Sequence, residues 1–199
     1  MKVILSEQDI TRAIKRRGRY KMDYTSTTLN NKAINKAREL AITAHWGQMY
    51  GAHPYIYHLT EVAEVCDEFG LPEYVVAAAF LHDIIEDTDV HADQICAEFG
   101  YEVATLVYAV TDCEGENRKE KKEKTYPKIL SHPYGVHLKL ADRIANVTEC
   151  STAKDTGLFN MYCKEALKFE EALRTPGIAD DMWNRLDSIY GKYKGQIKG

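Results

Sequence analysis

Apolar residues recur at spacings of three and four along most of the chain, which is the pattern of amphipathic helices. Strict alternation over the length of a strand is rare, so the sequence does not favour a core built on a β-sheet. We predict an all-α fold, with helices near residues 6–17, 27–46, 58–69, 72–86, 92–99, 101–111, 118–131, 135–152, 157–173 and 180–194. Residues 47–57 contain Gly47, Gly51 and Pro54 and are predicted to form a loop.

The chain has 199 residues, a length that suits one well-buried core. No internal repeat or low-complexity linker interrupts it. We therefore expect an N-terminal extension with a short helix at residues 1–25, followed by a single domain at residues 26–199. The charged run at residues 118–124 predicts an exposed helix face or a mobile loop. A role for residues 113–127 as a lid stays open.

Composition and charge argue against several classes of partner. The net charge of −4 lacks the basic excess that is typical of nucleic-acid-binding proteins. No stretch approaches the length of a membrane-spanning helix. The five cysteines form no C-x-x-C pair, which favours a reducing compartment over a disulfide framework. We expect a cytoplasmic protein that binds neither nucleic acid nor membranes.

The most apolar predicted helix ends in the charged sequence His82-Asp83-Ile84-Ile85-Glu86-Asp87. Burying an unpaired ionised carboxylate is strongly unfavourable, so charged residues at this position need a partner. His82 and Glu86 are four residues apart and share one helix face, and Asp83 and Asp87 share the neighbouring one. An inner His-Asp pair can bind a metal ion while the outer Glu-Asp pair handles water and protons.

Two other segments supply the remaining ligands of such a site. Asp142 and Asn146 repeat the four-residue spacing on a later apolar helix, and His58 opens an earlier one. His58, His82, Asp83 and Asp142 would offer two nitrogen and two oxygen ligands. This set suits Mn, Fe or Zn and leaves positions open for water and substrate. A single His-Asp pair is weak evidence and a single histidine is more often structural, but the joint pattern favours a metal site.

These segments resemble the hydrolase domain of the RelA/SpoT alarmone enzymes, and especially their small stand-alone hydrolases. The matching pieces are Ala44-His45-Trp46-Gly47-Gln48, Pro54-Tyr55-Ile56-Tyr57-His58, Ala78-Ala79-Phe80-Leu81-His82-Asp83-Ile84-Ile85-Glu86-Asp87-Thr88, Phe99-Gly100, and Lys139-Leu140-Ala141-Asp142-Arg143 with Asn146. The likeness runs from about residue 28 to about residue 173, and we expect neither the synthetase domain nor the regulatory domains of that family.

The resemblance implies a single HD-type helical domain with a mononuclear metal site. It also implies hydrolysis of guanosine tetra- and pentaphosphate (ppGpp and pppGpp) at the 3′ position, giving pyrophosphate and GDP or GTP. Mn²⁺ is the usual ion of the family, with Zn²⁺ and Fe²⁺ as alternatives. By motif, the metal ligands are His58, His82, Asp83 and Asp142, the acidic pair that activates water is Glu86 and Asp87, and the candidate substrate contacts are Asn146, Tyr50 and Gln48. The expected partner is the guanosine nucleotide, and a homodimer is a further option.

Two positions depart from the family pattern. The family usually has an arginine shortly after its Gly-Gln, where a flat cation packs on the guanine base. Here Met49 and Tyr50 occupy this stretch, and the loop is about one residue shorter. Tyr50 can stack on a base instead, which contributes about 1–3 kcal/mol in nucleic-acid complexes, or both residues can serve loop packing alone. Thr148 stands where the family often has a second arginine.

Three other functions stay open. The first is a related phosphohydrolase that acts on another nucleotide, such as an NADPH phosphatase or a nucleotidase. The second is a binuclear HD phosphodiesterase, for which His91, His132 and His137 would be the extra ligands, although their surroundings do not match that pattern. The third is a protein that binds alarmone without catalysis. Glu86 and Asp87 argue against it, because a pure binder has little use for a water-activating pair.

Overall fold

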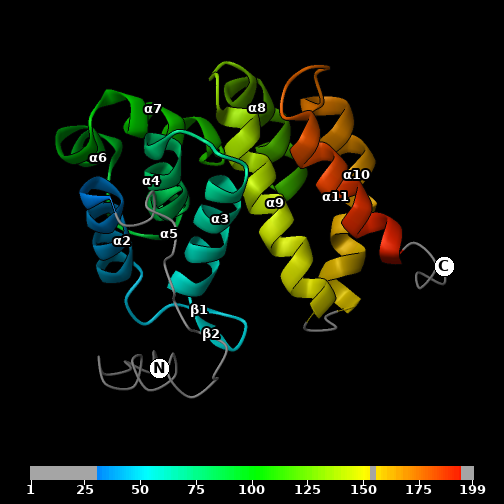
Figure 1. The fold of residues 1–199 in the computed structure, drawn as a ribbon, viewed down its shortest axis with the longest axis horizontal. Helices are drawn as coiled ribbons and strands as arrows, with labels where there is room; N and C mark the ends of the chain where they lie inside the picture. The colour runs from blue at the N-terminus through cyan, green and yellow to red at the C-terminus, as the bar shows by residue number, and fades with distance from the viewer. Residues whose placement is uncertain (1–30, 153–155, 194–199) are drawn as a thin grey trace.

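The protein is described from a computed structural model that covers residues 31–152 and 156–193 (Figure 1). Its helices are α2 (Lys32–Ala44), α3 (Ile56–Glu68), α4 (Glu73–Leu81), α5 (Ile84–Asp87), α6 (Ala92–Phe99), α7 (Tyr101–Val110), α8 (Arg118–Leu130), α9 (Gly135–Thr152), α10 (Thr156–Leu173) and α11 (Asp180–Tyr193). The strands of the described chain are β1 (Met49–Tyr50) and β2 (His53–Pro54). The predicted all-α fold is confirmed. The N-terminal extension and short helix predicted at residues 1–25 lie outside the described residues.

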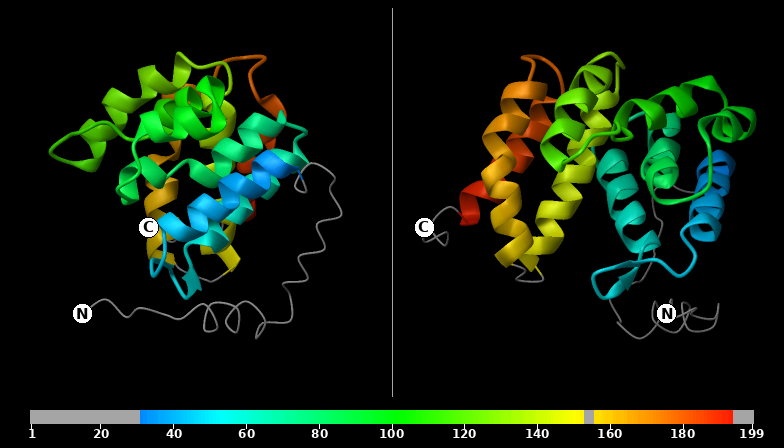
Figure 2. Two further views of the ribbon diagram at one scale, coloured as in Figure 1. Left: turned by 90° about the vertical axis from the view of Figure 1, so that its left-hand side faces the viewer. Right: turned by 180° about the vertical axis from the view of Figure 1, so that it is seen from behind.

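The α4 helix forms the centre of the first half of the fold. Every residue from Val75 to Leu81 is buried, so this helix has no polar face. It packs against α2, α3 and α7, which surround it in Figures 1 and 2. A short helix that is apolar on all sides is stable only when neighbours cover it on most sides. Within the described chain, no helix is long and apolar enough to cross a membrane.

The α9 helix joins this half to the C-terminal half. It packs against α3 on one side and against α10 and α11 on the other, and the three C-terminal helices run side by side in Figures 1 and 2. Ten of its residues, among them Leu138, Leu140 and Ala141, are buried in the core. Because α9 lies between both groups of helices, polar residues on it can meet side chains from either group.

The helix predicted at residues 72–86 is broken, and in this detail the prediction was wrong. The α4 helix ends at Leu81, α5 begins at Ile84, and His82 and Asp83 form the turn between them. The Nδ1 atom of His82 forms a hydrogen bond with the carbonyl oxygen of Ala79 at 2.8 Å. In a continued α-helix the amide of Asp83 would use that carbonyl, so a local side-chain bond competes with the helix here.

Residues 47–57 form a small hairpin rather than an irregular loop. The two strands pair antiparallel, with Tyr50 opposite His53. Gly51 has a φ of +57°, a left-handed conformation that glycine adopts without steric cost. The hairpin ends directly before α3 and brings Tyr50 over the N-terminal end of that helix, where His58 lies.

Gly135 marks a tight contact between α8 and α9. A Cβ atom at this position would lie 2.1 Å from the carbonyl oxygen of Ile129. We expect Gly135→Ala to lower the free energy of unfolding by about 1–3 kcal/mol, as overpacking does elsewhere. Chemical denaturation measures this. Gly191→Ala is the matched control, since a Cβ there meets no atom of the described chain within 4 Å. Equal midpoints for both variants would mean that α9 shifts freely.

Candidate metal centre and active site

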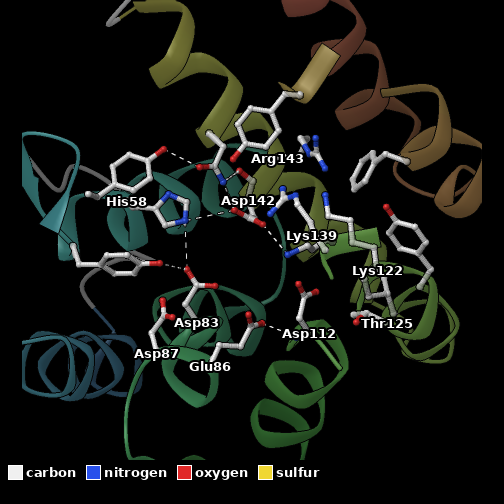
Figure 3. A pocket seen from close by; sticks show the side chains of 18 residues that line it. His58, Asp83, Glu86, Asp87, Asp112, Lys122, Thr125, Lys139, Asp142 and Arg143 are labelled. Atoms are coloured by element: carbon white, nitrogen blue, oxygen red, sulfur yellow. Dashed lines mark hydrogen bonds and ion pairs between the residues drawn. The ribbon is translucent and has the colours of Figure 1, made fainter. Parts of the chain in front are cut away.

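The four predicted metal ligands come from three elements and meet at one place (Figure 3). His58 lies in the first turn of α3, His82 and Asp83 form the turn between α4 and α5, and Asp142 lies on α9. His58 Nε2 is 3.7 Å from Asp83 Oδ2 and 3.5 Å from Asp142 Oδ1. His82 Nε2 is 3.1 Å and 3.9 Å from the same two oxygens. One ligand atom from each of His58, His82 and Asp83 falls within a 4.8 Å group.

The surroundings of His82 fit a bound cation. Its ring is buried, and Nδ1 lies 2.8 Å from the Ala79 carbonyl, which favours a proton on Nδ1. Nε2 then presents a lone pair toward Asp83, and no hydrogen bond reaches it within the described chain. Lone pairs and carboxylate oxygens at such distances repel one another unless a positive charge lies among them. A divalent metal ion would supply this charge, and two histidines with two aspartates are a suitable ligand set.

Neighbouring residues orient the two carboxylates. The Tyr55 hydroxyl donates to Asp83 Oδ2 at 2.7 Å, and Lys139 Nζ lies 2.9 Å from Asp142 Oδ2. Burial opposes ionisation of Asp142, but the nearby Lys139 ammonium outweighs it and holds the pKa of that carboxyl well below its usual range. Asp142 is therefore ionised. Sequence reasoning missed both supporting residues, although Tyr55 stands within the motif before His58 and Lys139 is one helical turn before Asp142.

The acidic pair lies beside the metal ligands and faces the same cavity (Figure 3). Glu86 Oε1 accepts a hydrogen bond from the backbone amide of Asp112 at 2.6 Å. The surrounding protein raises the pKa of Glu86 to about 6, mainly by desolvation. A carboxylate with such a pKa is ionised at neutral pH and still basic enough to accept a proton from water. Asp87 lines the same wall next to it.

The cavity has a volume of about 240 Å³ and carries opposite charges on its two sides. His58, Asp83, Glu86 and Asp87 lie on one side and Lys122 and Arg143 on the other, while Asp142 and Lys139 lie between them as an ion pair (Figure 3). The basic residues are Arg118, Lys122, Lys139 and Arg143. Arg118 and Lys122 belong to the run predicted to be an exposed face or mobile loop. The prediction holds for Arg118, which is exposed although its guanidinium reaches Glu165, and it was wrong for Lys122, which turns inward and pairs with the same carboxylate.

Two of the three candidate substrate contacts line the cavity. The Tyr50 ring stacks on the His58 ring with centroids 4.7 Å apart, and its hydroxyl donates to Asn146 Oδ1 at 2.8 Å. The Asn146 amide in turn donates to Asp142. Both residues thus orient predicted metal ligands, Tyr50 through His58 and Asn146 through Asp142. Gln48 lies behind the cavity wall, where its amide nitrogen donates to the backbone carbonyl of Asp87 at 2.7 Å.

The extra histidines considered for a binuclear centre do not join the cluster. The group of metal-type ligands found among the described residues contains none of His91, His132 and His137. They are also not among the residues that line the cavity. The geometry therefore favours one metal ion at this centre.

Tyr50→Phe should lower kcat by about three- to tenfold, because Asn146 loses the donor that orients it and Asp142 becomes less fixed. The ring, and hence its stacking on His58, remains. Steady-state kinetics at saturating metal measure the effect. Tyr57→Phe is the control, since that hydroxyl donates to Glu149 instead. Equal rates for wild type and Tyr50→Phe would show that Asn146 needs no such support.

Comparison with known proteins identifies the family. Residues 37–158 match the family model described as HD domain, a match that covers more than half of the chain and includes all four ligands. The chain therefore belongs to the HD domain family. An HD domain implies a divalent metal, and the cluster of His58, His82 and Asp83 agrees with that.

Several relatives share the name of an alarmone hydrolase, and others are named GTP pyrophosphokinases. The guanosine-3′,5′-bis(diphosphate) 3′-pyrophosphohydrolase of Borreliella burgdorferi is 34% identical over 128 residues, 60% of this chain and 19% of that protein. The mouse protein of the same name, MESH1, is 36% identical over 107 residues, 52% of this chain and 60% of that protein. The chain thus matches less than two thirds of either relative's length. The resemblance to alarmone hydrolases predicted from the motifs is confirmed.

A solved structure supports the fold. It is described as a metazoan orthologue of SpoT that hydrolyses ppGpp and plays a role in starvation responses. It aligns with a TM-score of 0.70 at 24% identity, covering 82% of this chain and 97% of that chain. At this level of identity the likeness concerns the arrangement of the helices, and it covers a larger share of the chain than the HD match does.

Proposed function

We propose that the chain hydrolyses ppGpp and pppGpp at the 3′ position, giving pyrophosphate and GDP or GTP. The observation that carries the proposal is the convergence of His58, His82, Asp83 and Asp142 beside Glu86 in one cavity. The names of relatives at 34% and 36% identity support the choice of substrate. The basic wall of the cavity also suits a substrate with several phosphates.

The chemistry follows from the residues around the ligand set. When bound, a divalent ion lowers the pKa of a water ligand and polarises a phosphoryl oxygen. Glu86 accepts the proton of the attacking water. A bond forms between the water oxygen and the phosphorus on the 3′ oxygen, the bond from that phosphorus to the 3′ oxygen breaks, and the 3′ oxygen takes up a proton. Tyr55, Lys139 and Asn146 hold the aspartate ligands during these steps.

Mn²⁺ is the ion we propose, with Zn²⁺ and Fe²⁺ as alternatives. Two nitrogen and two oxygen ligands suit all three, and the mixed set does not select one of them by itself. Metal analysis of the purified protein, followed by removal of the metal and reactivation with each ion, identifies it. We expect one equivalent per chain, since the described ligands form one cluster. Two equivalents would favour a binuclear phosphodiesterase.

A related phosphohydrolase that acts on another nucleotide is the second candidate. The observation that favours it is the position of Tyr50, which stacks on His58 and donates to Asn146. No cation occupies this place in the chain, whereas the resembling family uses an arginine there to hold guanine. Substrates whose phosphate is attached to another base, such as NADPH or a nucleoside phosphate, would not need that arginine.

One experiment separates the candidates. The purified protein is incubated with Mn²⁺ and, separately, with ppGpp, NADPH and a set of nucleoside mono-, di- and triphosphates, and ion-exchange chromatography resolves the products. Formation of GDP and pyrophosphate from ppGpp supports the first proposal. Turnover of another nucleotide with ppGpp intact moves the assignment to the second. Tight ppGpp binding without products would indicate a binding protein, and His82→Ala is the control for contaminating activity.

A further inference from the structure

Three basic side chains form a group on the wall of the cavity that lies away from His58. Arg118 and Lys122 come from α8, Arg143 comes from α9, and all three line the cavity. Figure 3 shows Lys122 and Arg143 on the far side of the cavity from His58 and Asp83. We call Arg118, Lys122 and Arg143 the basic triad.

One carboxylate on α10 connects the whole basic triad. Glu165 Oε1 accepts a hydrogen bond from Arg118 Nε at 2.7 Å, and Glu165 Oε2 accepts one from Lys122 Nζ at 2.5 Å. Arg143 Nη2 lies 3.4 Å from the same Oε2. Glu165 is not among the residues that line the cavity, so it contacts the cations from behind and does not occupy the space where a ligand would bind.

The charges of this group are not balanced by Glu165 alone. Burial, together with repulsion from Arg143 and Arg118, lowers the pKa of Lys122 to about 8, although Glu165 opposes the change. Burial would raise the pKa of Glu165, but Arg118 and Lys122 outweigh it and lower the pKa to about 2. Glu165 therefore supplies one negative charge to three basic groups, and Asp112 adds a weaker interaction with Arg118. Three cations that share one bonded carboxylate can also bind the oxygens of a phosphate group in the cavity.

Arg143 is the most buried member of the basic triad. Its side chain is only 6% exposed, and its guanidinium lies over the rings of Tyr162 and Phe169, at 4.7 Å and 4.4 Å from their centroids. Its Nη1 atom is buried and meets no acceptor in full hydrogen-bond geometry within the described chain, although the Tyr190 hydroxyl lies near the guanidinium. The two rings fix the plane of the guanidinium, and a planar cation fixed at the wall of a cavity suits a phosphate group.

We propose that Glu165 is a positioning residue, which holds the basic triad as a subsite for a phosphate group of the substrate away from the metal ligands. Without it, three long cationic side chains would repel one another and lose their common direction. The identity of the substrate rests on the proposed function, whereas the binding of a phosphate anion to the basic triad does not require turnover.

Binding of inorganic pyrophosphate to the full chain tests the subsite without catalysis. Isothermal titration calorimetry in a buffer with EDTA keeps metal-bound pyrophosphate from contributing. We expect Glu165→Gln to weaken binding by about tenfold, the effect of losing charged hydrogen bonds that order the triad. Glu171→Gln, which removes the same charge from an exposed position of α10, should bind like wild type. Unchanged or tighter binding by a folded Glu165→Gln variant overturns the proposal, as does the absence of pyrophosphate binding in wild type.

A double-mutant cycle distinguishes positioning from general support of the fold. If Glu165 acts through the triad, Arg118→Ala and Glu165→Gln together should weaken pyrophosphate binding by less than the product of their separate effects. Fully independent effects would overturn the proposal. Lys122→Ala removes a triad cation directly and should give a loss similar to Glu165→Gln. If Glu165→Gln does not fold, the Lys122→Ala variant still tests whether the basic triad binds pyrophosphate.

Kinetics provide the second readout. With ppGpp as substrate, Glu165→Gln should raise KM by about tenfold and leave kcat within about threefold, because the triad is remote from the reacting phosphorus. A fall in kcat with unchanged KM would overturn the proposal. If wild type does not hydrolyse ppGpp but binds pyrophosphate in a Glu165-dependent manner, the substrate assignment fails and the subsite remains.

Discussion

Replacing His82 by alanine should remove the metal ion and lower kcat/KM by at least about a thousandfold, since metal assistance contributes several kcal/mol to such reactions. His82 is buried, and its Nε2 is aimed at Asp83 and Asp142 with no other partner in the described chain. Alanine leaves two carboxylates and one imidazole, which hold a divalent ion weakly. The loss of turnover should therefore follow the loss of metal.

Metal content and turnover are measured on the same preparations. Inductively coupled plasma mass spectrometry gives the metal per chain, and thermal unfolding shows whether the variant is folded. His91→Ala serves as the control, because His91 is exposed and lies outside the ligand cluster. A His82→Ala variant that retains both its metal and its activity would place the metal centre elsewhere in the molecule.

Helical spacing predicted most of the fold because each helix carries its own pattern of apolar residues. The helices expected at 92–99 and 135–152 coincide with α6 and α9. The break after Leu81 escaped prediction, because the hydrophobic pattern continues through Ile84 and Ile85 while the backbone does not. The backbone helix breaks where the His82 ring forms a hydrogen bond with the Ala79 carbonyl. The spacing of apolar residues does not reveal this contact.

The metal ligands were accessible to sequence reasoning for a different reason. His82 and Asp83 are adjacent, and a charged pair at the end of an apolar helix is conspicuous without knowledge of the fold. Lys122 gave no such signal, since its partner Glu165 is 43 residues away and its neighbours in sequence are charged residues. A run of lysines and glutamates is normally solvated, and only the packing of α8 against α10 turns one side of it inward.

Glu86→Gln should lower kcat by about 10²–10⁴-fold, the usual contribution of a general base, while the metal stays bound. The glutamine keeps the size of the side chain and can still accept the hydrogen bond from the Asp112 amide, so the fold around it should not change. It cannot accept a proton from water. Full metal occupancy combined with this loss would separate proton transfer from metal binding.

The pH dependence of kcat provides a second test of Glu86 as the general base. The pKa of Glu86 is raised to about 6, so the basic form is present above that pH and is lost as the pH falls through it. Wild-type kcat should therefore rise with pH up to about 7 and then level off, and Glu86→Gln should lack this rise. Metal content measured at each pH excludes loss of the ion as the cause.

The Asp87→Asn variant tests which member of the acidic pair, Glu86 or Asp87, is the general base. Asp87 lines the same cavity beside Glu86, but its backbone carbonyl holds Gln48 and its carboxylate is not joined to the Asp112 amide. We expect its loss to cost less than that of Glu86, because the fixed carboxylate with the raised pKa is the better proton acceptor. If Asp87→Asn instead abolishes the pH-dependent rise and Glu86→Gln does not, the base is Asp87, and Glu86 anchors the Asp112 segment at the edge of the cavity.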